Sequence, residues 1–412
     1  MGGHHASRFI PTVEREAIDL VYVKLHKSGN YDVSSPRRDQ AVSVWNKELL
    51  RVGGFLCRAV YEHELGDIRA RWKALDAQPD APSEARSSLE QRFVHALRFF
   101  TFHASTPSAL VSHVMETAFF ACAKDDSITV LSTAGVMSAR EVRYPDPAFM
   151  GFLKRIPVLP TTVLEPAKAM ILNLRQRGLL SAIVFSDVLR ELRSRSLAED
   201  EMVECLKWRI GLSDDIILAH REELTVQFFG AAAFFIPAQD GVTERVVSLA
   251  SIQTFLNIKS GVPIDGPLPL HTMPFSVTRH LHIQKLKPQL GWKQLTISSW
   301  VAYLVSSDSE FSLGPDNRIT SCPEFAEQVF NILAKSWNSI PPPEQQHIIQ
   351  LLRLTTCVPT VLGMKRPNES YLPNVNMFPD LAIIRTPGPL KGDKERLVRL
   401  LRLRTDSLHF VR

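Results

Sequence analysis

Three stretches of this 412-residue chain have the pattern of a β-hairpin, and each of them turns at a glycine. Glycine adopts positive φ without the steric cost that other residues meet, so it is favoured in such turns. We therefore expect a chain assembled from related modules, and not one enzyme built around a single pocket. The three stretches are SITVLSTAGVMSAREVRYP around Gly135, AFFIPAQDGVTERVVSL around Gly241 and CVPTVLGMKRPNESYLPNVNMFPDL around Gly363.

The order of elements between consecutive hairpins also recurs. A proline-rich crossing leads to a helix that ends near Gly178 or Gly291, then to a short strand (182–185 or 295–297) and two further helices. Helix, short strand, helix, helix and hairpin is the order of a winged helix-turn-helix module. The glycines of the hairpins lie 106 and 122 residues apart, which predicts a weak internal repeat. A coincidence of unrelated hairpins and helices remains the alternative.

The N-terminal third is predicted to be helical. Apolar residues recur at helical spacing at Val44, Val52, Leu56 and Val60 and continue to Ile68 and Trp72. A capping-box pattern, Ser88 with Gln91, predicts the start of a second helix, and a third covers about 107–123.

These patterns predict an α+β, multi-domain fold in which an N-terminal α-helical bundle precedes mixed α/β modules with winged-helix-like element order and β-hairpins. The predicted parts are an N-terminal strand and insertion or loop (1–43), the bundle (44–125), two α/β modules (126–230 and 231–355), a C-terminal hairpin and loop (356–390) and a basic tail helix (391–412).

Within the C-terminal motif, particular residues are expected to shape the loop. Proline fixes φ and removes a backbone donor, so three prolines should determine the course of the chain there. Two polar side chains should anchor it. The prolines are Pro359, Pro367 and Pro373, and the anchors are Glu369 and Tyr371.

Composition and charge narrow the possible functions. The five cysteines show no spacing of a zinc site or a disulfide framework, which is typical of a reducing compartment.

The net charge of +5 comes mostly from residues 391–412. The rest of the chain is nearly balanced in charge, so nucleic acid is an unlikely partner. The two helices in the recognition position, 197–207 and 323–335, each carry more acidic than basic residues. No apolar stretch approaches the roughly 20 residues of a membrane span. We expect a cytoplasmic protein.

Motifs of common catalytic sites are missing from the sequence. It contains no GxxxxGK[ST], GxGxxG, GxSxG or HExxH. The pair His63-Glu64 with Asp67 is interpreted as an exposed helix face. We therefore predict no catalytic residue, no bound cofactor and no metal ligand, although a hydrolase triad dispersed along the chain remains open.

Two N-terminal runs carry a family resemblance. FIPTVEREAIDL (9–20) and VWNKELLRVGGFLCRAVYEHEL (44–65) resemble the region after the nucleotide-binding domain of large uncharacterised fungal proteins. Those proteins have a sacsin-like ATPase head of the heat-shock-chaperone (histidine-kinase-like) type. The runs GLLSAIVFSDVLREL and CVPTVLGMKRPNESYLPNVNMFPDL are similar to the downstream body of the same proteins.

The resemblance implies a body region without its ATPase head. The DxGxG motif of that superfamily does not occur here, so ATP is implied only for a full-length relative. In such a relative, Glu14 or Arg15 would lie near the nucleotide. The chain is thus expected to be a truncated or divergent relative that acts as a non-catalytic scaffold through protein contacts. A winged-helix nucleic-acid-binding protein and a hydrolase are the alternatives.

Overall fold

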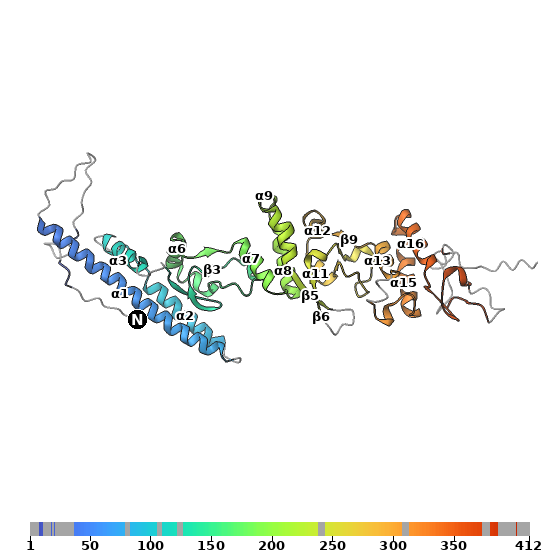
Figure 1. The fold of residues 1–412 in the computed structure, drawn as a ribbon, viewed down its shortest axis with the longest axis horizontal. Helices are drawn as coiled ribbons and strands as arrows, with labels where there is room; N and C mark the ends of the chain where they lie inside the picture. Colours follow the sequence, from blue (N-terminus) through green and yellow to red (C-terminus); the bar gives the residue numbers. More distant parts are fainter. Residues whose placement is uncertain are drawn as a thin grey trace, which may run out of the picture. The chain divides into compact units, whose positions relative to one another are not determined.

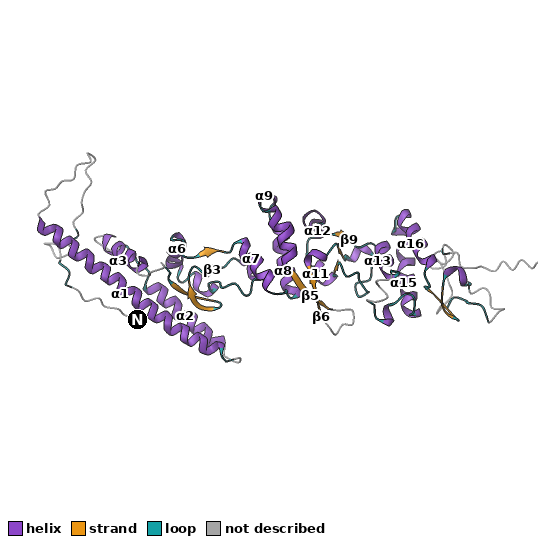
Figure 2. Ribbon diagram, in the orientation of Figure 1, coloured by secondary structure: helices purple, strands orange, loops and turns teal. Residues whose placement is uncertain are grey.

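The computed structural model describes residues 8–10, 18, 20, 37–78, 83–104, 109–121, 127–237, 244–306, 313–372, 380–385 and 401. The chain divides into two compact units, Met1–Glu191 and Leu192–Arg412, and each unit has a hydrophobic core of its own. Helices and small sheets mix in both units (Figure 2). The predicted α+β, multi-domain class with a helical N-terminal region is therefore confirmed. The finer division into six parts stays a prediction.

Three long helices begin the first unit: α1 (Arg37–Asp76), α2 (Ser83–Phe99) and α3 (Ala109–Ala121). Both α2 and α3 pack along α1 (Figure 1). Buried rings of Tyr61, Phe100 and Phe119 meet between them at centroid distances of 5.6–6.0 Å. Gly54 permits the close approach of α3, because a Cβ atom there would lie 2.3 Å from the carbonyl oxygen of Met115.

Two predicted helix boundaries were wrong. The first helix begins at Arg37 instead of Val44, and the second begins at Ser83 instead of Ser88. The residues just after Ser83 include Glu84, Ala85 and Arg86, which all favour helix, so the helix includes the capping-box pattern within its first turns instead of starting there.

The rest of the first unit contains short elements. The strands are β1 (Thr129–Ser132), β2 (Gly135–Ser138), β3 (Arg143–Tyr144) and β4 (Ser181–Ala182). The helices are α4 (Pro147–Met150), α5 (Thr161–Leu164), α6 (Lys168–Gln176) and α7 (Phe185–Ser194), and the division between the units falls within α7.

The second unit has a larger set of elements around a core that includes Trp300, Leu333 and Leu352. Its helices are α8 (Glu199–Gly211), α9 (Asp214–Ala219), a π-helix (Glu223–Gln227), α10 (Phe228–Ala231), α11 (Phe275–Thr278), α12 (Ile283–Leu290), α13 (Ile297–Leu304), α15 (Pro323–Ser336) and α16 (Pro342–Leu354). Its strands are β5 (Ala233–Pro237), β6 (Glu244–Ser248), β7 (Thr254–Phe255), β8 (Thr272–Met273), β9 (Lys293–Gln294), β10 (Val358–Thr360) and β11 (Gly363–Lys365).

The pairing of the short strands repeats from one unit to the other. Strand β3 pairs in parallel with β4 and, through Arg143, with Val158. Strand β7 pairs in parallel with β9 and β8. Each unit thus contains one central strand with a parallel partner on either side. The helix before the last partner ends close to a left-handed glycine, Gly178 after α6 and Gly291 after α12. The repeated order of elements is accompanied by a repeated topology.

The same pairing differs from that of a winged-helix module. Each short strand joins the parallel strand upstream of it, while the hairpins β1–β2, β5–β6 and β10–β11 form two-stranded antiparallel sheets. The expected strands at 182–185 and 295–297 also lie about two residues too late. Phe185 and Ile297 instead begin helices α7 and α13, where the hydroxyl of Thr296 accepts the N–H of Ser299.

Among the helices that the structure describes, none combines the length and the apolar character needed to cross a membrane.

Candidate functional site

The first and third predicted hairpins turn at glycines with positive φ, 100° at Gly135 and 92° at Gly363. In both turns a hydroxyl three residues earlier donates to the glycine carbonyl, from Ser132 at 2.7 Å and from Thr360 at 2.6 Å. The same hydroxyl accepts the amide N–H two residues after it. This shared [ST]-x-x-G signal is present in the sequence, but our sequence analysis missed it.

The two glycines differ in their surroundings. A Cβ atom at Gly135 would lie 3.1 Å from the indole of Trp72, whereas one at Gly363 would meet nothing within 4 Å. At position 135, glycine is therefore favoured both by the positive φ and by the nearby Trp72 ring. At position 363, it is favoured by the positive φ alone. The other predicted residues Gly241, Pro373, Glu14 and Arg15 lie outside the described residues.

The structure brings four predicted residues of the C-terminal motif into one short region. Pro359 lies in β10 and its carbonyl accepts the N–H of Arg385 at 2.8 Å. Pro367 is buried at the start of a 3₁₀ turn, and the Glu369 carboxylate accepts a backbone N–H of the same turn at 3.3 Å. Tyr371 forms a parallel bridge with Ile383 through backbone bonds. These contacts are structural and form no reactive constellation.

An unexpected feature is an exposed apolar face on α1. Six large apolar side chains are 43–60% exposed and recur at helical spacing, so they lie on one side of the helix. Leu50, Tyr61 and Leu65 are buried on the other side, against α2 and α3. We call the exposed set the α1 stripe: Val44, Trp45, Val52, Phe55, Leu56 and Val60.

The α1 stripe corrects the simple interpretation of the apolar spacing in this helix. Of the positions that the sequence pattern grouped together, Ile68 and Trp72 are buried, but Val52, Leu56 and Val60 are exposed. In the described part of the segment before α1, the backbone of Ile10 forms two hydrogen bonds of 2.8–2.9 Å with buried Asn46. The carbonyl of Arg8 accepts the indole N–H of Trp45, at one end of the stripe. Among the described residues, α2 and α3 pack against the opposite face of the helix.

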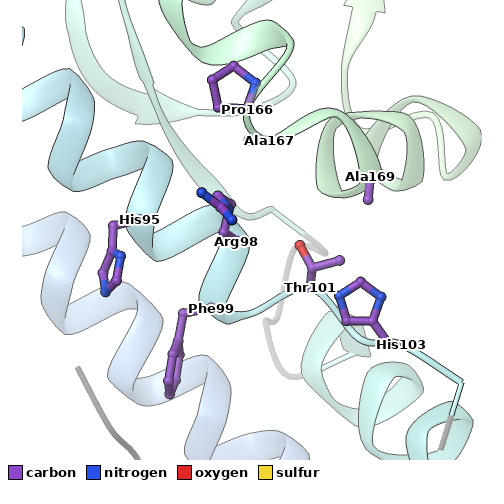
Figure 3. A pocket seen from close by; sticks show the side chains of 8 residues that line it. All are labelled: His95, Arg98, Phe99, Thr101, His103, Pro166, Ala167 and Ala169. Atoms are coloured by element: carbon purple, nitrogen blue, oxygen red, sulfur yellow. The ribbon is translucent and has the colours of Figure 1, made fainter.

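An open pocket of about 550 Å³ lies beside the end of α2, within the first unit. Arg98, from α2, and His103, from the segment after it, approach the pocket from one side, and Ala169 of α6 forms part of the opposite side (Figure 3). The exposed ring of Phe99 adds an apolar surface. Basic and apolar groups thus line the same hollow.

The polar set on α1 was wrongly interpreted as a solvated helix face. The Glu64 side chain is buried and accepts a hydrogen bond from Arg92 of α2 at 2.7 Å, and Asp67 accepts another at 3.2 Å. The bond with Glu64 is the main cause that raises the pKa of Arg92. This set holds α2 against α1 and has no free carboxylate pair for catalysis.

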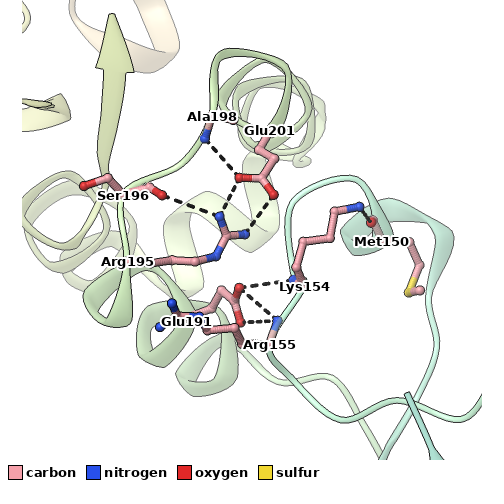
Figure 4. Close-up of polar contacts among 8 residues, drawn as sticks. All are labelled: Met150, Lys154, Arg155, Glu191, Arg195, Ser196, Ala198 and Glu201. Atoms are coloured by element: carbon pink, nitrogen blue, oxygen red, sulfur yellow. Dashed lines mark hydrogen bonds and ion pairs between the residues drawn. The ribbon is translucent and has the colours of Figure 1, made fainter. Parts of the chain in front are cut away.

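Two further polar groups stabilise loops (Figure 4). In the first unit, the carboxylate of Glu191 on α7 accepts the backbone N–H groups of Lys154 and Arg155 at 3.0–3.1 Å. In the second unit, Glu201 of α8 pairs with Arg195 and accepts the N–H of Ala198 at 3.0 Å, which caps that helix. Both carboxylates therefore accept hydrogen bonds from groups within the fold.

Three of the described cysteines are poorly suited to act as nucleophiles. Burial raises the pKa of Cys357 to about 12 and also raises the pKa of Cys205 and Cys57. A thiol with a raised pKa is a poor nucleophile at neutral pH, because the thiolate is the reactive form. Within the described ranges, no three His, Cys, Asp or Glu side chains are grouped so that they could hold a metal ion.

The two helices in the recognition position pack into the core. Helix α8 buries Met202, Val203 and Leu206, and its exposed Glu204 pairs with Lys207 at 2.7 Å. Helix α15 likewise buries much of its length, including Phe325 and Phe330. Neither helix presents a row of basic side chains, which phosphate contacts require.

Comparison with known proteins gives one match. Residues 1–407 match the family model DUF3684, described as a protein of unknown function. No curated protein matches the chain, and no solved structure does.

Proposed function

Because this chain belongs to the DUF3684 family of proteins of unknown function, we propose its role from its own structure: a non-catalytic scaffold that binds another protein. The observation that carries this proposal is the α1 stripe. Contiguous exposed apolar surface is uncommon on soluble proteins and often marks a site of protein interaction. Aromatic anchors such as Trp45 and Phe55 also contribute strongly to protein interfaces.

The repeated topology supports the same role. Repeat modules bury their cores between neighbouring elements and leave an extended surface for binding partners. The carboxylates of Glu64, Glu191 and Glu201 are all bound to donors within the fold. Their occupation by structural contacts favours a binding role over catalysis.

The family resemblance adds a second part to the proposal. We propose that the chain corresponds to the body region of sacsin-like proteins in the cytoplasm, so that ATP would bind to a head encoded elsewhere in a full-length relative. Sequencing of the transcript and of the adjacent genomic DNA tests this. An upstream reading frame that encodes a DxGxG-containing head is the expected result, and its absence in the locus and in related loci would contradict it.

The binding role is tested by a charge substitution within the α1 stripe. The double variant Val52→Glu/Leu56→Glu should keep its fold, because both side chains are already about half exposed (46% and 51%). Burying two carboxylates in an apolar interface costs free energy, because each must lose its water. Partner binding should therefore weaken by at least about 30-fold. Crosslinking with mass spectrometry identifies the partner, and titration calorimetry with the purified partner measures the affinity.

The matched control is Ala70→Glu/Ala74→Glu, which adds two carboxylates with the same spacing at exposed positions of the same helix outside the stripe. This control should bind like the wild-type chain. Circular dichroism verifies that both variants remain folded. Equal affinity of the stripe variant and the control would refute the docking role of the α1 stripe.

A further inference from the structure

We infer that the pocket beside the end of α2 binds a small organic phosphate. This site is separate from the α1 stripe, and its ligand belongs to a different chemical class from a protein partner. The pocket holds about 550 Å³, which falls within the range of small-molecule sites. Its lining combines basic side chains with apolar ones, as an organic anion requires.

The basic lining comes from two adjacent segments. His95 and Arg98 lie on α2, and His103 follows two residues after Thr101 in the segment that leaves the helix. Among the lining residues in the described part of the chain there is no carboxylate. The Arg98 side chain is exposed and forms no ion pair within the described residues, so the forked N–H groups of its planar guanidinium are available to a phosphate.

Two carboxylates on the segments that flank the pocket, Glu165 and Glu90, have partners of their own. Glu165, which precedes α6, is 85% exposed and pairs with Lys168 at 3.4 Å. Glu90 of α2 accepts the hydroxyl of Thr162 at 2.5 Å. Within the described residues, neither forms an ion pair with Arg98. The first turn of α6, which forms the opposite side, contributes the positive end of a helix dipole and adds to the attraction of an anion.

The apolar residues that line the pocket favour an apolar group attached to the phosphate. The ring of Phe99 is 40% exposed, and Ala169 and Pro166 add small apolar surfaces. A phosphate at Arg98 would place an attached ring or short chain on the side of Pro166 and Ala169, while Phe99 points to another part of the pocket (Figure 3). Phenyl phosphate is therefore a suitable probe, because it combines a dianionic group with one ring.

The experiment titrates the full chain with phenyl phosphate, inorganic phosphate and phenol, each by calorimetry. Phenyl phosphate should bind saturably and more tightly than either of the other two. The Arg98→Gln variant should weaken its binding at least about tenfold, because a hydrogen bond to a charged group is lost. Arg71→Gln, which removes an exposed arginine of α1 outside the pocket, should leave the affinity unchanged.

Three results would overturn the inference: the absence of saturable binding, phenol binding as tightly as phenyl phosphate, or equal weakening in Arg98→Gln and Arg71→Gln. The last result would indicate nonspecific attraction to positive charge. If Arg98→Gln fails to fold by circular dichroism, His103→Gln replaces it, since His103 is an exposed side chain at the same pocket. Unchanged affinity in that folded variant would equally refute the site.

Discussion

Two buried arginines of this chain have opposite surroundings. Arg58 is 4% exposed and donates to the carboxylate of Glu62 and to the carbonyls of Phe119 and Ser127. Arg209 is 1% exposed, but it donates only from Nη2, to the carbonyl of Gln289 at 3.3 Å, and its Nε and Nη1 have no partner within the described residues. Burial lowers the pKa of Arg209. Its charge therefore costs free energy at neutral pH, where arginine remains protonated.

At the scale of a residue, this contrast predicts opposite effects of the same substitution. Arg209→Met should raise the free energy of unfolding by about 1–3 kcal/mol, because it removes unsatisfied buried donors. Arg58→Met should lower it by a similar amount of about 1–3 kcal/mol, because three acceptors lose their donor. Urea unfolding followed by circular dichroism measures both. A loss of stability in both variants would contradict the assignment of Arg209 as an uncompensated charge.

At the scale of an element, helix α7 is held to strand β3 by one carboxylate. Asp187 of α7 accepts hydrogen bonds from Arg143 at 2.7 and 3.2 Å and from the N–H of Val184 at 3.2 Å. Burial acts to raise the pKa of Asp187, but the bonds from Arg143 and Val184 outweigh it, so the pKa lies below its usual value of 3.8. The ionised carboxylate thus stabilises the folded chain.

The hydrogen bonds of the Asp187 carboxylate predict how the stability of the folded chain depends on pH. Because the folded pKa lies below the unfolded one, the contribution of Asp187 is complete above about pH 5 and is lost as the pH falls through 4 and below. Asp187→Asn should therefore cost about 1–3 kcal/mol at pH 7 and progressively less toward pH 3. Urea unfolding at several pH values tests this, with the exposed Glu165→Gln as control. A difference between wild type and Asp187→Asn that stays constant from pH 7 to pH 3 would disprove it.

At the scale of the whole molecule, the chain has two separate hydrophobic cores. One contains Phe93 and Phe119 in the first unit, and the other contains Trp300 and Leu333 in the second. Each unit also has its own set of parallel strands and at least one hairpin with the same hydroxyl-to-glycine bond. Two cores of this kind should unfold as two cooperative events.

Glycine substitutions in the two hairpins distinguish these events. Gly135→Ala and Gly363→Ala each place a side chain at positive φ, which costs about 1–3 kcal/mol. Each should lower the Tm of one calorimetric transition, by about 2–4 °C per kcal/mol for units of this size. Gly135→Ala should have the larger effect, because its Cβ also meets Trp72. A single transition that both variants shift equally would show that the units unfold together.

Local signals predicted the hairpins best. Gly135 and Gly363 have the expected positive φ because each follows the two turn residues and pairs with Ser132 or Thr360, a position where a left-handed glycine returns the chain to the strand. Helix spacing was less informative about burial. It predicted that Val52 and Trp72 belong to one amphipathic helix, but it could not distinguish the packed face from the α1 stripe, because both faces are apolar.

The sequence by itself determined the α+β class, the hairpin turns and the recurring order of elements, since these depend on residues that are close along the chain. Only the tertiary structure decided which strands pair, which face of α1 is covered, and that His95, Arg98 and His103 share a pocket with Ala169. Parallel pairing and pockets join segments that are distant in sequence. Their formation depends on long-range packing, which no local pattern of residues encodes.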